Sequence, residues 1–252
     1  MRRLCFALVA GAAFAMLLSS AVRAQTEEFT AANKFYEEKD YPSAIRLYLG
    51  VLNRHGESAA LYLNLGNAYF KAGDLGHAVL YYTRAKRLAP TDEDIAHNLE
   101  FARQFSRVRM EGVQLNPINA FLRSIVDPYQ LDSMAWLTGA LFIVFMLFLT
   151  IRFGLGVVSP VARIGATVAL VFLFVLGGLT SFKYRTDFLT RWAVIIADEC
   201  PVRTGASEQS DMELQGAPGL IVEIMSETSD YYNVLFENKR RGWVKKELVA
   251  EI

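Results

Sequence analysis

Three long apolar runs divide a chain whose remaining residues are of mixed polarity. The first run, residues 4–18, follows two arginines and leads into the small residues Val22 and Ala24. A basic start, a short apolar stretch and small residues before a cleavage point are typical of a secretory signal peptide. We therefore predict that residues 1–24 are a cleaved signal peptide, since the polar residues 25–28 follow at once. A retained membrane anchor is the alternative.

The second and third runs, residues 133–151 and 164–182, each contain 19 residues without a charge. A helix needs about 20 apolar residues to cross the hydrocarbon layer of a bilayer, so both runs predict transmembrane helices. Residues 152–163 then form the hairpin between the two helices. We expect residues 111–132 and 183–191 to be the linkers that flank this pair.

The distribution of lysine and arginine around these runs does not orient them, although cytoplasmic loops usually hold the excess. The predicted signal peptide orients the two helices, because it exports the start of the mature chain. The first transmembrane helix then returns the chain to the cytoplasm, and the second brings it out again. We therefore expect a protein of the bacterial cytoplasmic (inner) membrane, with both soluble parts facing the periplasm or the cell exterior.

Residues 25–110 are polar with a helical period, and the pattern repeats at a spacing of 34. Ala44 corresponds to Ala78 and Tyr48 to Tyr82. This period is the signature of the tetratricopeptide repeat, a pair of helices joined by a turn, and the region resembles that family. The resemblance implies an all-α helical stack with a degenerate first unit, a complete second unit and a third that ends after one helix. We expect the second unit to be held together by Tyr62, Leu65, Gly66, Tyr69, Ala78, Tyr82, Ala85 and Pro90.

The resemblance also implies a concave face that binds an extended peptide or a partner helix. Asparagines suit this role, because an amide offers both hydrogen-bond donors and an acceptor to a ligand backbone. The expected groove residues are Asn33, Tyr36, Asn64, Asn67, Phe70, Lys71, Asn98 and Phe101. The alternative is that the asparagines are solvated or bridge neighbouring helices. Chaperone-type members of the family bind a terminal carboxylate with basic residues, and Phe29, Asp94 and Asn98 stand in those places, which favours a more neutral ligand.

Residues 192–252 have a different texture, with short runs of β-branched and aromatic residues between polar turns. Short strands at regular spacing predict a small all-β barrel. The segments 202–205 and 241–244 resemble those of the bacterial Src-homology-3-like domain. Trp243 is a possible ligand contact of this barrel, and a core or rim aromatic is the alternative.

Charge and composition narrow the range of partners. The 26 basic and 26 acidic side chains cancel, which argues against a nucleic-acid partner, since nucleic-acid binding needs a basic surface. Residues 192–252 contain 11 acidic and 6 basic side chains, which favours a protein partner over an anionic wall polymer. Cys5 leaves with the signal peptide, so Cys200 remains as a single cysteine, which we expect to be a small buried apolar side chain.

The sequence contains few side chains in the spacing that catalytic or metal sites need. The histidines at 55, 77 and 97 have no second histidine or cysteine at metal-ligand spacing. The chain has no nucleophile elbow, zinc-protease motif or phosphate-binding loop. We therefore expect no metal, no cofactor and no enzymatic activity.

The order of the parts carries a further resemblance. The chain is expected to contain, in order, a signal peptide, a tetratricopeptide stack, a two-helix transmembrane hairpin and a Src-homology-3-like domain. This order resembles the BatE family of the bacterial aerotolerance (Bat) operon. The chain would then be a multidomain membrane protein with the same class of partners as that family. The resemblance implies von Willebrand factor A-type membrane proteins and a MoxR-type ATPase. We predict a membrane-anchored scaffold or adaptor that acts in aerotolerance or envelope stress. The alternative is a cell-wall-sensing module whose Src-homology-3-like domain binds peptidoglycan peptide.

Overall fold

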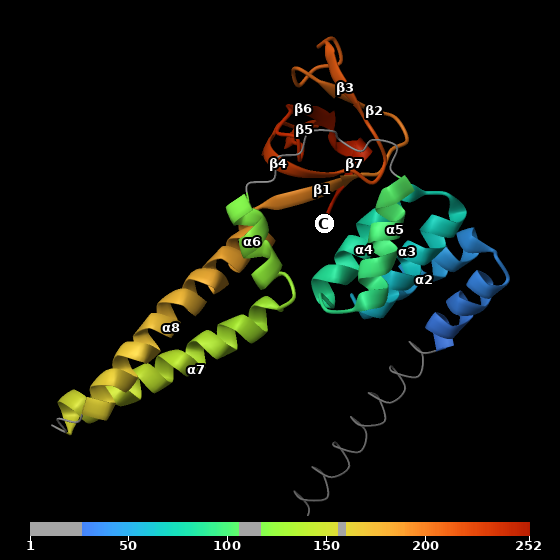
Figure 1. Cartoon of the computed structure of the whole chain (residues 1–252). Helices are drawn as coiled ribbons and strands as arrows, with labels where there is room; N and C mark the ends of the chain where they lie inside the picture. Colours follow the sequence, from blue (N-terminus) through green and yellow to red (C-terminus); the bar gives the residue numbers. More distant parts are fainter. Residues whose placement is uncertain (1–26, 106–116, 156–159) are drawn as a thin grey trace, which may run out of the picture.

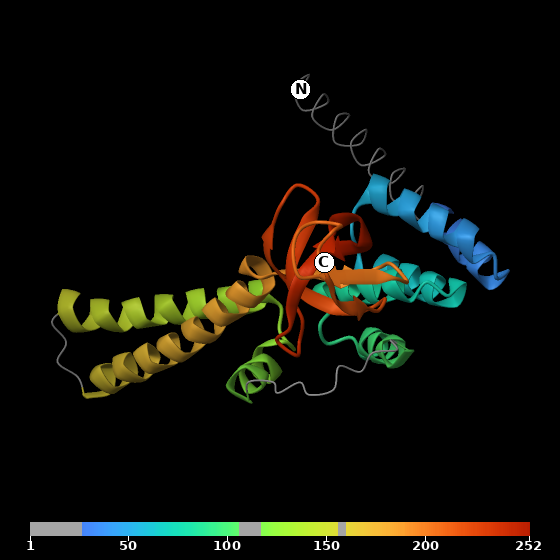
Figure 2. The ribbon, with the colours of Figure 1, turned by 90° about the horizontal axis from the view of Figure 1, so that it is seen from above.

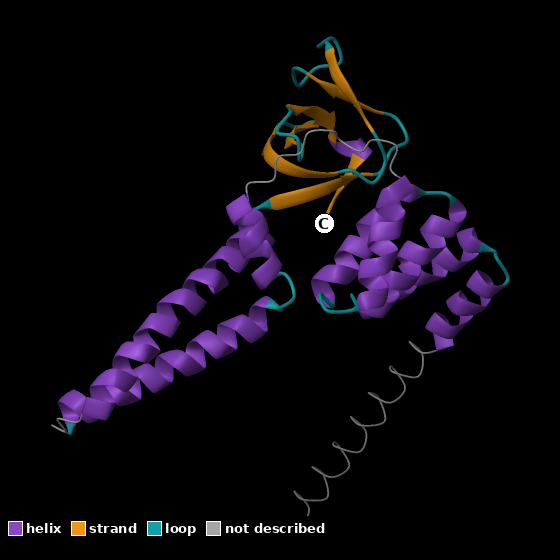
Figure 3. Cartoon of the chain, in the orientation of Figure 1, coloured by secondary structure: helices purple, strands orange, loops and turns teal. Residues whose placement is uncertain are grey.

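The computed structural model describes residues 27–105, 117–155 and 160–252 (Figure 1). The predicted signal peptide, residues 1–24, lies outside the described residues. The described chain forms a helical stack, a pair of long helices and an antiparallel β-sheet, which Figure 3 separates by colour.

The helical stack begins with a helix at residues 27–37. It continues with α2 (Tyr41–His55), α3 (Ala59–Ala72), α4 (Leu75–Leu88) and α5 (Glu93–Phe105).

Polar side chains fix where these helices begin. The carboxylate of Asp40 accepts a hydrogen bond from the Ser43 N–H at the start of α2, and Asp74 does the same for the His77 N–H of α4. The Ser58 hydroxyl caps α3. Such caps satisfy backbone donors that have no partner inside the helix. The turn between α3 and α4 passes through Gly73, whose φ of 87° is a left-handed conformation that glycine adopts without strain.

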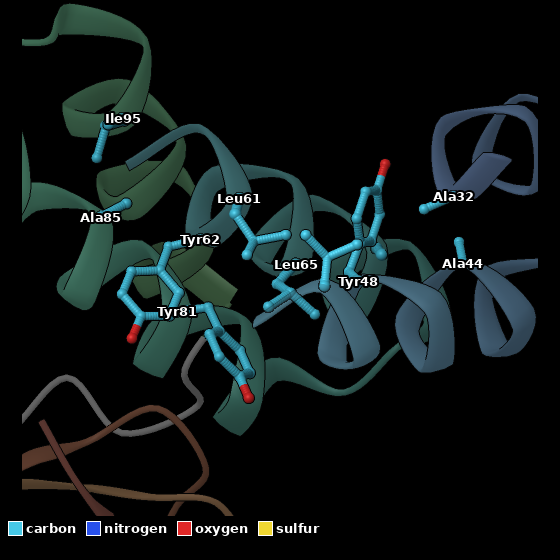
Figure 4. Packing of buried hydrophobic residues seen from close by; sticks show 11 residues of the cluster. Ala32, Ala44, Tyr48, Leu61, Tyr62, Leu65, Tyr81, Ala85 and Ile95 are labelled. Carbon is cyan, nitrogen blue, oxygen red and sulfur yellow. The ribbon is translucent and has the colours of Figure 1, made fainter. Parts of the chain in front are cut away.

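The core of the stack consists of the apolar faces of the paired helices. Figure 4 shows Leu61 and Leu65 of α3 beside Tyr48 of α2. Tyr62 lies beside Tyr81 of α4, with ring centroids 5.8 Å apart. The spacing of 34 seen in the sequence therefore corresponds to successive helix pairs that bury the same face.

The two long helices are α7 (Leu131–Leu149) and α8 (Pro160–Tyr184), and both continue through π-helical turns, Thr150–Gly154 and Arg185–Leu189. They lie side by side and extend away from the rest of the molecule (Figure 1, Figure 2). Only 6% of the apolar window of each helix is buried inside the structure, whereas the core helix of a soluble protein is mostly buried. Both are long and apolar enough to cross a membrane.

One polar contact joins the two long helices near the body of the molecule. The hydroxyls of Thr138 and Thr180 lie 3.0 Å apart. Nearer the far end of the pair, Gly165 lies against the ring of Phe148, where a Cβ atom would come within 2.6 Å of that ring. A glycine and a threonine pair therefore let the helices approach closely.

The segments expected to be linkers are largely helical where they are described. Helix α6 (Pro117–Val126) lies inside the expected linker 111–132. The expected linker 183–191 is the continuation of α8 and the start of the first strand. The reason is that a helix does not end where its apolar face ends: Lys183 and Asp187, one turn apart, form an ion pair of 3.2 Å that supports the extra turn.

The C-terminal part is an antiparallel sheet of seven described strands. They are β1 (Arg191–Ile195), β2 (Cys200–Arg203), β3 (Met212–Gly216), β4 (Ile221–Glu227), β5 (Tyr231–Leu235), β6 (Arg241–Lys245) and β7 (Val249–Glu251). A 3₁₀ turn, Lys246–Leu248, precedes β7.

The strand order is β3-β2-β6-β5-β4-β1-β7, so the sheet has two ends, at β3 and β7. The structure thus shows an antiparallel sheet around one core and not a closed barrel. Cys200 lies fully buried in that core, as expected from the sequence, and burial raises the pKa of its thiol to about 12.

The helical stack packs directly onto the sheet through α4 and β1. Val79 and Leu80 of α4 share a buried cluster with Val194 of β1. Gly76 lies so close to the backbone of Ile196 that a Cβ atom would come within 2.5 Å of its Cα. Arg84 donates a hydrogen bond of 2.6 Å to the carbonyl oxygen of Glu251. Stack and sheet therefore form one body at the end of the helix pair where α7 begins and α8 ends (Figure 1).

Candidate functional site: the groove of the helical stack

The stack has a hollow between its first helix, α2 and α3. The pocket measures about 290 Å³ and is lined by Asn33, Tyr36, Glu37, Tyr48, Asn64 and Asn67. Four of the eight predicted groove residues are among them. Glu37 and Tyr48 are lining residues that the sequence reasoning missed.

Asparagines and tyrosines on successive helices form a hydrogen-bonded ladder below this hollow. The Oδ1 atom of Asn33 accepts hydrogen bonds from the Tyr48 hydroxyl, at 2.6 Å, and from Nδ2 of Asn64, at 3.2 Å. One repeat later, Oδ1 of Asn67 accepts from the Tyr82 hydroxyl, at 2.7 Å, and from Nδ2 of Asn98, at 3.3 Å.

The two sets of ladder bonds are related by the spacing of 34, and they join neighbouring helices. The bridging role that the sequence left open as an alternative is therefore present. An amide has two donors and one acceptor group, and each of these four asparagines uses only part of that capacity in the ladder. The Nδ2 atoms of Asn33 and Asn67 and the Oδ1 atoms of Asn64 and Asn98 take no part in these four bonds. The ladder therefore fixes the amides in position and still leaves donors and acceptors.

The ladder tyrosines remain hydrogen-bond donors over the physiological pH range. Burial raises the pKa of Tyr48 to about 12 and raises that of Tyr82 further. A neutral hydroxyl is the form that can donate to an asparagine oxygen. The repeated pair of an asparagine and a tyrosine 15 residues later is the sequence signal that would have identified Tyr48.

The character of the surface changes from polar to aromatic along α3 and α5. Phe70, Phe101 and Phe105 form a cluster in which the ring centroids are 5.1 to 5.6 Å apart. Phe101 and Phe105 are exposed. Phe101 stands one repeat after Asn67, so the asparagine position of the ladder is replaced by a phenylalanine. Lys71, also a predicted groove residue, is exposed near the end of α3.

Of the residues expected to hold the second repeat together, all but Pro90 lie on α3 or α4. A Cβ atom on Gly66 would come within 2.5 Å of the Tyr82 ring, so only glycine fits there without a shift. Tyr69 stacks on Tyr81 with ring centroids 5.4 Å apart. Ala78 and Ala85 are fully buried, and Pro90 follows the end of α4 by two residues.

Trp243 lies apart from these features, on β6 of the sheet. It is half-buried, opposite Arg203 of β2 and Asn233 of β5. Among the residues that the structure describes, no group of three or more His, Cys, Asp or Glu side chains could hold a metal ion.

Comparison with known families identifies the helix pair formed by α3, which lines the pocket, and α4. Residues 59–92 match the family model of the tetratricopeptide repeat. The chain carries a tetratricopeptide repeat. The repeat consists of α3 and α4, and it contributes Asn64 and Asn67 to the pocket. A search of curated proteins found no significant match to the chain. Because this repeat is a protein-interaction module, its groove is the candidate functional site.

Proposed function

We propose that the protein is a non-enzymatic, membrane-anchored scaffold or adaptor that binds a segment of a partner protein in the groove of its tetratricopeptide stack. The observation that carries this proposal is the pocket above the asparagine ladder. The amides of Asn33, Asn64 and Asn67 are held in fixed orientations by their bonds to one another and to tyrosines. Preorganised donors and acceptors suit the backbone of an extended segment, since little conformational freedom remains to be lost on binding.

The aromatic cluster suggests the composition of the bound segment. Exposed phenylalanine rings next to a polar pocket provide an apolar contact for one or two large side chains of a ligand. We propose a segment of near-neutral charge that carries an apolar side chain beyond its polar-bound part.

The apolar helices α7 and α8 support anchoring in a membrane. Helix α7 begins, and α8 ends, at the body formed by the stack and the sheet. Stack and sheet would therefore lie on one side of a bilayer that the helix pair spans. We propose that this side is the periplasm or cell exterior and that the membrane is the bacterial cytoplasmic membrane, as an exported N-terminus would require.

We further propose a BatE-like role in aerotolerance or envelope stress, with von Willebrand factor A-type membrane proteins and a MoxR-type ATPase as partners. The C-terminal sheet would be a bacterial Src-homology-3-like domain. Its acidic balance and its packing against α4 favour support of the stack over binding of a wall polymer.

Two alanine variants provide a matched test of the groove. Asn64→Ala and Asn98→Ala each remove one ladder bond of nearly equal length, but Asn64 lines the pocket and Asn98 lies outside the lining set. The detergent-solubilised protein is affinity-purified, and its partners are identified by mass spectrometry. We expect Asn64→Ala to lose a partner that Asn98→Ala retains, with unchanged helical circular dichroism in both.

Two results would contradict separate parts of the proposal. Equal recovery of every partner by both variants would exclude the pocket as the binding site. Recovery of partners that include no von Willebrand factor A-type or MoxR-type protein would remove the Bat assignment and leave the groove intact.

A further inference from the structure

The last turns of α8 bury one charged side chain, Lys183, and expose two aromatic rings, Tyr184 and Phe188, whereas Arg185 between them is exposed. Lys183 is buried, with its ammonium 3.2 Å from the Asp187 carboxylate and 4.0 Å from that of Asp127, which follows α6. Tyr184 and Phe188, the adjacent pair one turn apart, are exposed and stack on each other at 5.6 Å. In water, the lysine would be expected outside and the aromatic pair inside.

The length of α8 places this region at the surface of a bilayer. The candidate span Pro160–Leu189 contains 30 residues. At about 1.5 Å per residue it extends about 45 Å, whereas the hydrocarbon layer is about 30 Å thick. The uncharged run 164–182 matches that layer, so residues 183–189 emerge into the headgroup region. Tyrosine and tryptophan side chains concentrate at that depth in membrane proteins.

Helix α6 presents apolar side chains in the same region. It packs against α8 and lies at the end of the helix pair where the body begins (Figure 1). Val126 is fully buried against the rest of the molecule, whereas Phe121 is 64% exposed. The guanidinium of Arg123 lies over the ring of Trp192, 5.3 Å from its centroid, and ties α6 to β1. Helix α6 therefore has apolar surface beyond what its packing covers, at a fixed position beside the bilayer.

We infer that α6 and the end of α8 form a membrane-surface contact, in which Phe121, Tyr184 and Phe188 insert into the headgroup–acyl boundary of the phospholipid bilayer. The occupant of this apolar surface is lipid, because Tyr184 and Phe188 follow directly on the exposed apolar run of α8, against which α6 packs. The contact seats the body against the bilayer and fixes its tilt. An amphipathic helix in this position buries its apolar side to a depth of about 5–10 Å. The inference rests on the proposed insertion of the helix pair.

Depth measurements on single labels test the inference in the full chain reconstituted in phosphatidylcholine vesicles. Cysteine replaces Phe121, Phe188 or Met212 in separate variants that also carry Cys5→Ser, and each carries an environment-sensitive fluorophore. Met212 on β3 is the matched control, because it is 61% exposed and Phe188 is 60% exposed. The buried Cys200 stays unlabelled, since burial raises the pKa of its thiol to about 12. Quenching is compared between aqueous iodide and lipids that carry a nitroxide near the headgroup.

We expect the labels at 121 and 188 to be quenched by the shallow nitroxide lipid and protected from iodide, and the label at 212 to behave in the opposite way. A label at 121 that is quenched by iodide as strongly as that at 212 would overturn the inference.

A fourth label, in place of the exposed Phe174 within the uncharged run of α8, separates this failure from that of the proposed anchoring. Quenching at 174 by a deep nitroxide lipid without quenching at 121 leaves the anchor and removes the surface contact. No quenching at 174 removes the proposed membrane insertion itself.

Discussion

Replacing Gly76 by alanine should loosen the contact between the helical stack and the sheet without unfolding either. The Cβ atom of an alanine would come within 2.5 Å of Cα, 2.6 Å of the carbonyl oxygen and 2.9 Å of the carbonyl carbon of Ile196. All three are backbone atoms, so no side-chain rotation can relieve the clash. Helix α4 or the strand end must move apart by about 1 Å to restore ordinary van der Waals distances of 3.5–4.0 Å.

The change in the free energy of docking between stack and sheet is set by the contributions that differ between the docked and undocked states. Alanine has a higher helix propensity than glycine by about 1 kcal/mol, but α4 is helical whether or not the sheet is docked, so this gain does not change the docking equilibrium. The cost of overpacking remains, about 1–3 kcal/mol. At about 1.4 kcal/mol for each factor of ten, the undocked population should rise roughly 5- to 150-fold.

Amide hydrogen exchange read by mass spectrometry measures this change. We expect faster exchange in β1 and at residues 250–252 of Gly76→Ala, and unchanged exchange in α2 and α3. The control is Gly50→Ala, where the nearest atom is Nη2 of the flexible Arg54 side chain at 3.1 Å. Wild-type exchange in β1 of Gly76→Ala would show that the stack and the sheet do not depend on this contact and would refute the reasoning.

Two further changes test the stack itself. Tyr82→Phe removes the hydroxyl that donates to Asn67 at 2.7 Å and should lower the unfolding free energy by about 0.5–1.5 kcal/mol. Tyr48→Phe removes the equivalent bond one repeat earlier and should have a similar effect. Chemical denaturation measures both changes. Burial raises the pKa of Asp74, but hydrogen bonds from the His77 backbone and ring outweigh it and hold that pKa below its usual range. A carboxyl with a lowered folded pKa contributes stability that is complete above its unfolded pKa of about 4 and is lost as pH falls through the folded value. Asp74→Asn should therefore flatten the decline of the melting temperature below about pH 4. The same decline in the variant as in the wild type would show that this carboxylate does not contribute to the pH dependence of stability.

The sequence by itself determined the local elements. The spacing of 34 between equivalent small and aromatic residues predicted the helix pairs of the stack, and residues 59–92 match the repeat family. The uncharged runs predicted the two apolar helices, because a helix that is apolar all round has no soluble partner to cover it. Short runs of β-branched and aromatic residues predicted that the strands lie within residues 192–252, and β1 to β7 lie there apart from Arg191, the first residue of β1. Each of these patterns lies within a short segment of the sequence, so it does not depend on contacts with distant residues.

Only the tertiary structure decided how these elements meet. The packing of Gly76 against Ile196 joins residues 120 positions apart, and nothing in either segment specifies the other. The asparagines were recognised as polar groove positions, but their bonds to Tyr48 and Tyr82 depend on side chains from different helices. Past its apolar run, α8 meets Asp127, which lies before α7 and whose carboxylate is 4.0 Å from the Lys183 ammonium. Periodicity records which face of an element is apolar, whereas the choice of partner for that face is set by shape and charge across the whole fold.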